Sequence, residues 1–308
     1  MLRARQSPIK GSRMHRRRRL VNIFKIGSVL IVLAGLGWGL SWLSYRPFWN
    51  IATVDVHGTV SVAAPSVQVL AANDINGAYG WLISKSNQIL YPRGKIAGDI
   101  EKNFPQVAAV QLAVSSDHVL TVNVTERQPA YRWCAAPDFA PNFPDAPTAL
   151  ATNQCYFMDN LGLIFMPVPG GNEVLVATSS MTTPTTGPQL FRFYGRVAST
   201  SVPVGASYTN KTDFAALAQL VFKMASQHLP SYALVSRPDG VDELFLNQGG
   251  AIIFDDGQDL TQVATDVAAL QQSTTIFANG SKLEYVDVRL GNKAFYKLVD
   301  TATSTASQ

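Results

Sequence analysis

The residues with the most distinctive chemistry in this chain are its two cysteines, Cys134 and Cys155. They flank a proline-rich loop, and each lies on or beside a segment that we expect to be a strand. A disulfide between them would close a loop of about 20 residues and stabilise the fold by roughly 3 kcal/mol. Two buried thiols, or a redox or metal-binding pair, are the alternatives. The absence of C-x-x-C and of any histidine near either cysteine disfavours the last two roles.

Local motifs of the common catalytic sites are absent from the sequence. It contains no H-E-x-x-H, no G-x-S-x-G and no phosphate-binding G-x-x-x-x-G-K, and its only S-x-x-K lies at residues 7–10. The histidines are far apart in the chain, at His15, His57, His118 and His228. We therefore expect a non-enzymatic protein that has no cofactor, no bound metal and no small-molecule substrate. The alternative is an enzyme whose site is built from distant residues, which would leave no local motif.

The charged residues are unevenly distributed along the chain. The 25 lysines and arginines and 21 acidic residues give a net charge of +4, but residues 1–19 hold eight of the basic residues and no acid. The remaining 17 basic and 21 acidic residues leave residues 20–308 with a charge of −4. The basic character belongs to a short tail, which argues against a globular nucleic-acid-binding domain.

The apolar segment that follows this tail predicts a transmembrane helix over residues 21–44. Ile26–Leu43 contains no charged residue, and at 1.5 Å per residue the 23 residues from Val21 to Leu43 span roughly 34 Å, enough to cross a bilayer core of about 30 Å. Aromatic residues crowd its C-terminal end, and the basic tail, residues 1–20, is expected on the cytoplasmic side. A cleavable signal peptide is the alternative, but bulky residues follow the weak small-x-small site. No other segment is comparable, so we expect a single-pass plasma-membrane protein whose bulk is extracytoplasmic.

Residues 48–127 show the pattern of a small α+β domain. We expect a strand over 51–57, helices over 64–72 and 95–103, and strands over 108–114 and 119–126. A loop containing Gly77, Gly80 and Trp81 separates the two helices. The order β-α-α-β-β indicates a pair of helices packed on one face of a three-stranded sheet.

An ordered set of residues in this region resembles the POTRA domain of the FtsQ/DivIB family of bacterial cell-division proteins. The set follows a single membrane helix. It reads V-x-V-x-G, then L-Y-P followed by two isoleucines and F-P-x-V, and finally E-R-x-P. Its members are Val54, Val56, Gly58, Leu90, Tyr91, Pro92, Ile96, Ile100, Phe104, Pro105, Val107, Glu126, Arg127 and Pro129. The resemblance implies a POTRA domain over residues 48–127.

Residues 128–300 are expected to form a mostly antiparallel β domain with flanking helices. The patterns predict strands over 131–134, 154–159, 163–166, 242–247, 251–254, 283–290 and 294–299, and helices over 211–228 and 260–272. Residues 136–152 and 168–210 are expected to be loops, and residues 301–308 a flexible tail. The fold class is therefore α+β, with an N-terminal transmembrane helix, a β-α-α-β-β domain and this β domain.

Two segments of the second region also resemble the FtsQ/DivIB family. Residues 155–165 are similar to its D-x-x-G-h-h-F hairpin, and residues 285–289 are similar to its Y-V-D-L-R strand. Leu290 stands where some members place an aromatic residue, and the two long loops have no counterpart that we can align.

The resemblance implies a non-enzymatic scaffold of the divisome. It implies membrane partners that resemble FtsB/DivIC and FtsL, and localisation at the division septum. An unpaired terminal strand can bind a partner segment by β-augmentation. The candidate strand is 294–299, and the candidate partner-binding residues are Tyr285, Arg289, Phe295, Tyr296 and Lys297. A POTRA-type transport or chaperone subunit, or an anchored enzyme of cell-wall maturation, would be the alternatives.

Overall fold

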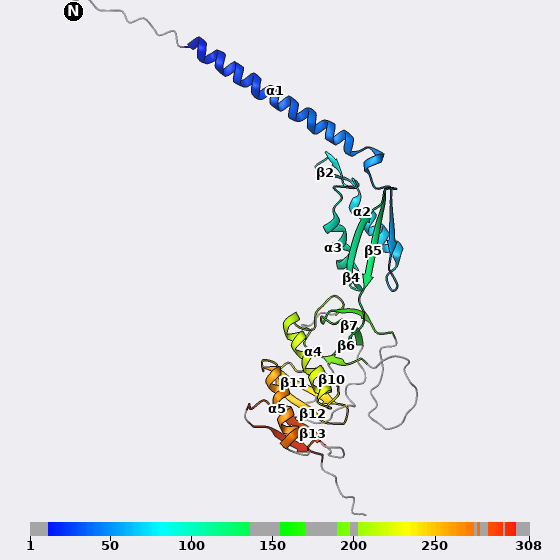
Figure 1. The fold of residues 1–308 in the computed structure, drawn as a ribbon, viewed down its shortest axis with the longest axis vertical. Coiled ribbons are helices and arrows are strands. Elements are labelled where there is room, and N and C mark those ends of the chain that lie inside the picture. The colour runs from blue at the N-terminus through cyan, green and yellow to red at the C-terminus, as the bar shows by residue number, and fades with distance from the viewer. Residues whose placement is uncertain are drawn as a thin grey trace, which may run out of the picture. The chain divides into compact units, whose positions relative to one another are not determined.

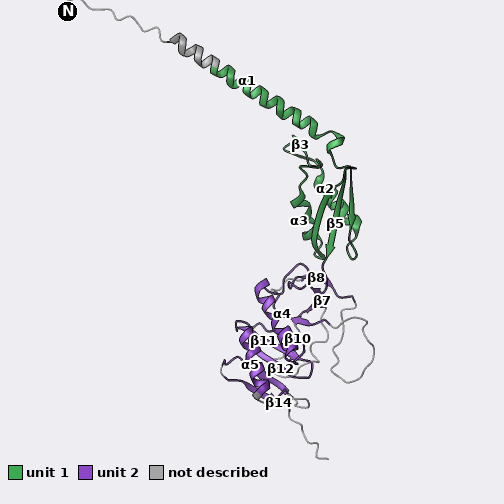
Figure 2. Ribbon diagram, in the orientation of Figure 1, with its two compact units in different colours: residues 1–126 green, residues 127–308 purple. Residues whose placement is uncertain are grey.

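The computed structural model describes residues 12–135, 155–169, 190–197, 203–273, 276–277, 283–291 and 293–299, with the backbone alone for residues 12–21 and 273. The expected loop 136–152 and tail 301–308 lie outside the described residues, as does most of the expected loop 168–210. The chain divides into two compact units, Met1–Glu126 and Arg127–Gln308 (Figure 2). We call them the first and second units.

The first unit begins with helix α1, Ser12–Ser44, which contains the predicted membrane segment. Its residues Asn22–Ser44 are long and apolar enough to cross a membrane, and none of the most apolar stretch is buried against the rest of the protein. The helix ends where the sequence predicts but begins at Ser12 rather than at residue 21. The arginines of the tail favour helix nearly as well as alanine does, so the helical pattern continues into the tail.

The remainder of the first unit is a three-stranded sheet with two helices. The strands are β1 (Thr53–His57), β4 (Val107–Val114) and β5 (Val119–Glu126), and the helices are α2 (Ala64–Ile75) and α3 (Arg93–Asn103). The sheet order is β1-β5-β4, with β1 parallel and β4 antiparallel to β5 (Figure 1). The two helices pack on the sheet through a core whose fully buried members include Val67, Ile96, Ile100, Leu120 and Val122.

Between the two helices the structure contains a small hairpin where the sequence pattern indicates a loop. Its strands, β2 (Ala78–Tyr79) and β3 (Ile83–Ser84), have two residues each and pair in antiparallel fashion. Two residues are too few to produce a recognisable alternation of apolar and polar side chains. A short 3-10 helix, η1 (Pro47–Trp49), connects α1 to β1.

The second unit is built on a nine-stranded sheet, counted over the described residues, with order β14-β13-β12-β11-β10-β9-β6-β7-β8. The strands are β6 (Tyr131–Cys134), β7 (Cys155–Met158), β8 (Ile164–Pro167), β9 (Arg192–Tyr194), β10 (Ser231–Ser236), β11 (Val241–Leu246), β12 (Ala251–Asp255), β13 (Leu283–Asp287) and β14 (Phe295–Leu298). Most neighbouring strands are antiparallel, which confirms the mostly antiparallel arrangement, but β9 pairs in parallel with β6 and β10, and β12 with β13.

Helices α4 (Lys211–Ser226) and α5 (Leu260–Ser273) pack beside this sheet. Their apolar stripes contribute Phe214, Leu217, Leu220, Val263 and Val267 to the large core, where strand residues such as Phe193 and Leu244 meet them. A smaller cluster, which includes Tyr194, Val235 and Phe245, consists of the neighbouring residues on the same strands. Because successive side chains of a strand point to opposite faces, the two clusters occupy opposite faces of the sheet.

Two strands of the second unit correct the sequence-based expectation. Strand β9 lies inside the stretch 168–210, which we expected to be loop throughout, and β10 was not expected at all. Strand β10 is central in the sheet and its last four residues are all buried, so it lacks the alternation that marks a half-exposed strand. Strand β9 has only three residues, and the parallel pairing with its two neighbours defines it.

Candidate functional site

Strand β14 lies at one end of the nine-stranded sheet (Figure 2). It pairs with β13 in antiparallel register, with Tyr285 opposite Lys297, Val286 opposite Tyr296 and Asp287 opposite Phe295. Among the described residues no strand pairs with its other side. Half of the backbone N–H and C=O groups of such a strand point outward, where they can accept another strand.

The opposite end of the sheet is protected, which distinguishes it from β14. Strand β8 is covered by residues 205–207, because Ile164 donates its N–H to the carbonyl of Ala206 at 2.9 Å and accepts from Gly205 at 2.7 Å. A further bridge joins Leu163 to Ser207, and Pro167, which has no N–H, ends the strand. The fold therefore closes one edge of this sheet with its own backbone.

The side chains of β14 are large, apolar and exposed. Phe295 is 54% exposed and Tyr296 is 52% exposed, and Leu298 and Val299 continue this surface. Strand β4 of the first unit is also a terminal strand, but its exposed side chains are small or amidic: Ala108, Ala109, Gln111 and Ala113. Large exposed apolar groups beside an open edge are typical of interaction sites, and β14 alone of these two strands presents them.

A pocket of about 230 Å³ adjoins this edge, between α5 and the connection from β13 to β14. Helix α5 contributes Asp266, Ala269 and Leu270, and the connection contributes Lys293 and Ala294 among others. Oδ1 of Asp266 accepts a hydrogen bond from the Gln262 amide at 2.7 Å, whereas Oδ2 is buried and has no hydrogen-bond partner in the described part of the chain. The pocket can therefore accept an apolar group that carries a hydrogen-bond donor.

Two ion pairs fix the polar side chains around the edge. Nζ of Lys297 lies 2.9 Å from Oε1 of Glu284, and the Arg289 guanidinium donates to both carboxylate oxygens of Asp287. Burial acts to raise the pKa of Asp287, but the hydrogen bonds from Arg289 outweigh it and hold that pKa below its ordinary value. The charges of Lys297 and Arg289 are thus paired within the second unit, and the exposed side chains of β14 itself are mainly apolar.

The structure brings together four of the five predicted partner-binding residues. Tyr285, Phe295, Tyr296 and Lys297 lie on the paired strands β13 and β14. Arg289 lies beyond the end of β13 and is engaged with Asp287, two residues before it. The residues that the sequence-based selection omitted are those of the pocket and the exposed Leu290, Leu298 and Val299. Leu298 and Val299 could have been selected from the strand pattern of residues 294–299. The pocket could not, because it depends on the packing of α5.

Several residues that carry the family resemblance have structural roles. The Glu126 carboxylate accepts hydrogen bonds from the N–H groups of Val60, Ser61 and Val62 and from the Ser61 hydroxyl, at 2.6–3.1 Å. Burial acts to raise the pKa of Glu126, but these bonds outweigh it and lower that pKa. The end of β5 is therefore fixed to the turn that precedes α2.

The D-x-x-G segment of the second unit has a similar structural basis. Arg127 donates to Oδ2 of Asp159 at 2.6 Å, while Oδ1 of Asp159 accepts from the N–H groups of Leu161 and Leu163 at 2.9 Å each. Gly162 has a φ of +81°, and a Cβ there would lie 2.7 Å from Cγ of Phe214. The turn between β7 and β8 therefore requires glycine for both its backbone and its packing.

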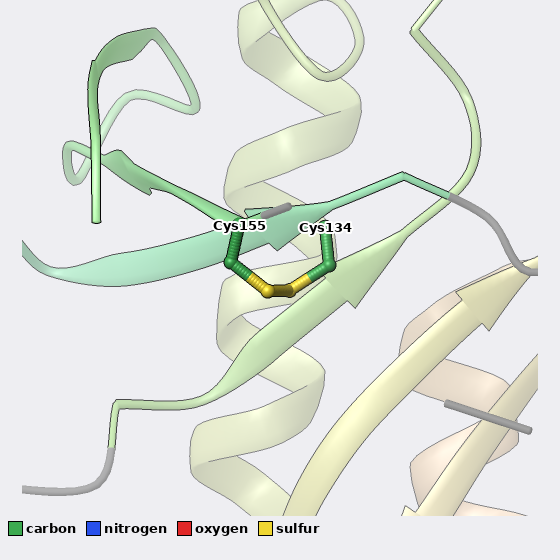
Figure 3. The surroundings of a disulfide bond; sticks show 2 residues. All are labelled: Cys134 and Cys155. Carbon is green, nitrogen blue, oxygen red and sulfur yellow. A yellow bond between two sulfur atoms is a disulfide. The ribbon is translucent and has the colours of Figure 1, made fainter. Parts of the chain in front are cut away.

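Cys134 and Cys155 are joined by a disulfide (Figure 3). They lie directly opposite each other on β6 and β7, with their Cα atoms 4.2 Å apart. Cys134 is fully buried in the smaller cluster, and Cys155 packs against it. The bridge lies near the β8 end of the sheet, because β6 and β7 stand six and seven positions from β14 in the sheet order.

The buried charges of the second unit form ion pairs inside the fold. Arg196 binds Asp242, which also accepts from the Ser236 hydroxyl, and Arg237 pairs with Glu243. Burial raises the pKa of Asp242, and burial raises the pKa of Glu243 to about 7. Within the described residues, no group of three or more histidine, cysteine or acidic side chains is arranged to hold a metal ion.

No family model matches the chain, and no curated protein matches it significantly.

Proposed function

We propose that this protein is a non-enzymatic, membrane-anchored scaffold of the bacterial divisome, similar to FtsQ/DivIB, and that it binds a partner by strand addition at β14. The observation that carries the proposal is the exposed, apolar edge of β14, which pairs with no further strand among the described residues. A protein that protects the β8 edge with its own backbone and leaves the β14 edge open has an edge suited to a partner strand.

The first unit supports the same proposal. Apart from the β2–β3 hairpin between the two helices, the element order after the apolar helix is β-α-α-β-β, the order that the resemblance to a POTRA domain implies. With the basic tail in the cytoplasm, α1 anchors the chain in the plasma membrane, and the rest of the first unit and the second unit lie outside it. The anchor restricts the two units to the membrane surface, which raises the effective concentration of other membrane proteins at the β14 edge.

The proposed partners are single-pass division proteins that resemble FtsB/DivIC and FtsL. An extended segment of such a partner pairs with the backbone of β14, and its side chains contact Phe295, Tyr296 and Leu298. A side chain at the end of the segment enters the pocket beside α5 and donates a hydrogen bond to Oδ2 of Asp266. Backbone pairing supplies affinity, and the pocket supplies specificity.

Two proline variants test the strand addition. Adjacent residues of a strand direct their N–H groups to opposite sides, so one of Tyr296→Pro and Lys297→Pro removes a bond to β13 and the other removes an outward N–H. We expect the outward variant to melt at the wild-type temperature and to lose at least about tenfold in capture of a co-expressed FtsB-like partner. The inward variant is expected to melt at a lower temperature.

The side-chain contribution has a matched control. Phe222 on α4 is 75% exposed, more than Phe295, and lies in the same unit. Tyr296→Ala and Phe295→Ala are expected to weaken partner capture, whereas Phe222→Ala is expected to leave it unchanged. Capture that survives both proline variants would refute the β14 site, and a fluorescent fusion spread evenly over the cell membrane would refute the divisome assignment.

A further inference from the structure

A second exposed apolar surface lies in the first unit, around the β2–β3 hairpin. Its members are Tyr79, Trp81, Leu82, Ile89 and Leu90, and we call it the hairpin surface. All five are exposed, Trp81 by 83%. They are not part of the core of the first unit. That core consists mainly of apolar residues of α2, α3 and the three-stranded sheet.

Hydrogen bonds hold the hairpin against the C-terminal end of α1. Ser84 donates its N–H to the Ser44 hydroxyl at 2.9 Å, and the Tyr45 hydroxyl donates to the carbonyl of Trp81 at 3.2 Å. The residues after α1 continue the contact, because Gln88 donates to the carbonyl of Trp49 at 2.9 Å. Figure 1 shows the hairpin beside the end of the helix. The hairpin therefore stays within a few ångströms of Ser44.

The position of Ser44 sets the depth of the hairpin in relation to a membrane. The apolar span Asn22–Ser44 has 23 residues, so at 1.5 Å per residue it covers roughly 34 Å against a hydrocarbon core of about 30 Å. When this span crosses the bilayer, Ser44 lies at the boundary between the acyl chains and the headgroups. Side chains held at that boundary contact lipid, and tryptophan and tyrosine favour that region.

The hairpin turn keeps a tryptophan where the backbone favours other residues. Gly80 and Trp81 are the central residues of the turn closed by the Leu82 N–H and the Tyr79 carbonyl at 3.1 Å, and their φ values are +50° and +66°. Positive φ at both central positions favours glycine, asparagine or aspartate. A bulky residue with positive φ is an outlier and is strained. Burial of the Trp81 side chain does not offset this strain, because the side chain is almost fully exposed.

The charges on the segment that forms the hairpin surface and on the segment after α1 are all positive. Arg46, Lys85 and Arg93 lie on the segments 44–54 and 75–93, which contain no acidic residue. The three bases lie over aromatic rings: Arg46 over Trp42, Lys85 over Tyr79 and Arg93 over Tyr91. Three acids border these segments: Asp117 lies in the turn that contacts Phe48 through His118, Asp55 lies beside His57, and Asp74 is paired with Lys95. The surroundings of the surface thus suit an anionic headgroup.

We propose that the hairpin surface inserts into the outer boundary of the bilayer, with its apolar side chains among the acyl chains and Arg46, Lys85 and Arg93 at the phosphates of anionic phospholipids. The inference rests on the membrane anchor of the proposed function and goes beyond it, because it gives the first unit a second attachment to the membrane. A rigid element with apolar and basic side chains binds a lipid surface through both groups, and a second attachment restricts the tilt of the unit that carries it.

The test uses the full chain in vesicles of phosphatidylethanolamine with a minor fraction of phosphatidylglycerol. A polarity-sensitive fluorophore is attached at Ile89→Cys, which leaves Trp81 in place, and the native cysteines do not react because they are joined in a disulfide. The matched control is Val60→Cys, a 93% exposed apolar position on the turn that Glu126 binds, at the other end of β1. The reference is Gly35→Cys in α1, where a side chain meets no neighbour.

We expect lipid-borne quenchers to reduce the fluorescence at positions 35 and 89, and aqueous iodide to quench at position 60. Quenching by lipid at position 89 should exceed that at position 60 at least about threefold. Trp81→Gly should reduce the lipid quenching at position 89 without lowering the melting temperature of the protein, because glycine relieves the backbone strain. Replacing phosphatidylglycerol by phosphatidylcholine should also reduce it.

Each other outcome overturns the inference and separates it from the proposed function. Lipid quenching at position 35 but equal quenching at positions 60 and 89 refutes the hairpin contact and leaves the anchor intact. No lipid quenching at position 35 refutes the anchor and the hairpin contact together. The fluorescence at position 89 could instead change with the number of protein molecules per vesicle and not with the amount of lipid quencher. That result would identify a second copy of the chain, and not lipid, as what contacts the hairpin surface.

Discussion

Removal of the disulfide should destabilise the second unit and leave the first unit unchanged. The bridge joins residues 21 positions apart, and the loss of loop-closure entropy for a loop of this length corresponds to about 3 kcal/mol. In a unit of this size, 1 kcal/mol changes the melting temperature by roughly 2–4 °C, so the double variant Cys134→Ala/Cys155→Ala should melt about 6–12 °C lower. Both cysteines belong to the second unit, and the effect should be confined to it.

The measurement is calorimetry of the full chain in detergent, where the two units give separate transitions when they unfold independently. Reductant serves as the matched control, because it should shift the wild-type transition to that of the double variant and leave the variant unchanged. Below the lowered transition, partner capture at β14 should stay at the wild-type level, since the bridge lies near the other end of the sheet. A shift of less than about 2 °C would refute the entropic reasoning. Lost capture in the still-folded variant would refute the separation of the two ends.

Two further predictions concern the interior of the second unit. Gly162→Ala should cost about 2–4 kcal/mol, because the new Cβ lies 2.7 Å from Phe214 and φ is positive, whereas the control Gly249→Ala has positive φ and open space and should cost about 1–2 kcal/mol in urea unfolding. Burial raises the pKa of Glu243 to about 7 in the native state, whereas the ordinary value of 4.5 applies to the unfolded state. Between pH 4.5 and 7 the native state therefore holds a proton that the unfolded state has released. The free energy of unfolding should therefore fall, by at most about 3 kcal/mol, as the pH rises from 4.5 to 7, and Glu243→Gln should flatten this dependence in urea unfolding across that range. Equal costs for the two glycine variants, or an unchanged slope in Glu243→Gln, would contradict the respective argument.

The sequence was most informative where one face of an element is exposed. Residues 119–126 alternate because β5 has one face on the core, and their predicted bounds agree with the structure. The helix at 211–228 was equally clear from its apolar stripe, of which Phe214 and Leu217 are buried. Strand β10 was missed because its last four residues are buried and carry no alternation, and β9 because only its neighbours define it.

The candidate site shows the same division between local and tertiary information. Phe295, Tyr296 and Lys297 could be selected from a short apolar strand near the C-terminus, because exposed large side chains on a strand are local features. The pocket could not be predicted, because Asp266 and Lys293 approach only when α5 packs beside the β13–β14 connection. The hairpin surface could not be predicted for a related reason. Its strands have two residues each, and its position depends on hydrogen bonds to Ser44 and Tyr45, far away in the sequence.

The amino-acid sequence by itself determined the apolar helix at residues 21–44, the asymmetry of charge around it and most of the strands and helices that follow. These features depend on the composition and period of single segments, which burial and backbone geometry impose locally. Only the tertiary structure decided which strands end the sheet among the described residues, that the two cysteines face each other and which loop lies against the helix end. Those relations join residues far apart in the chain, and the order in which strands pair and helices pack creates them.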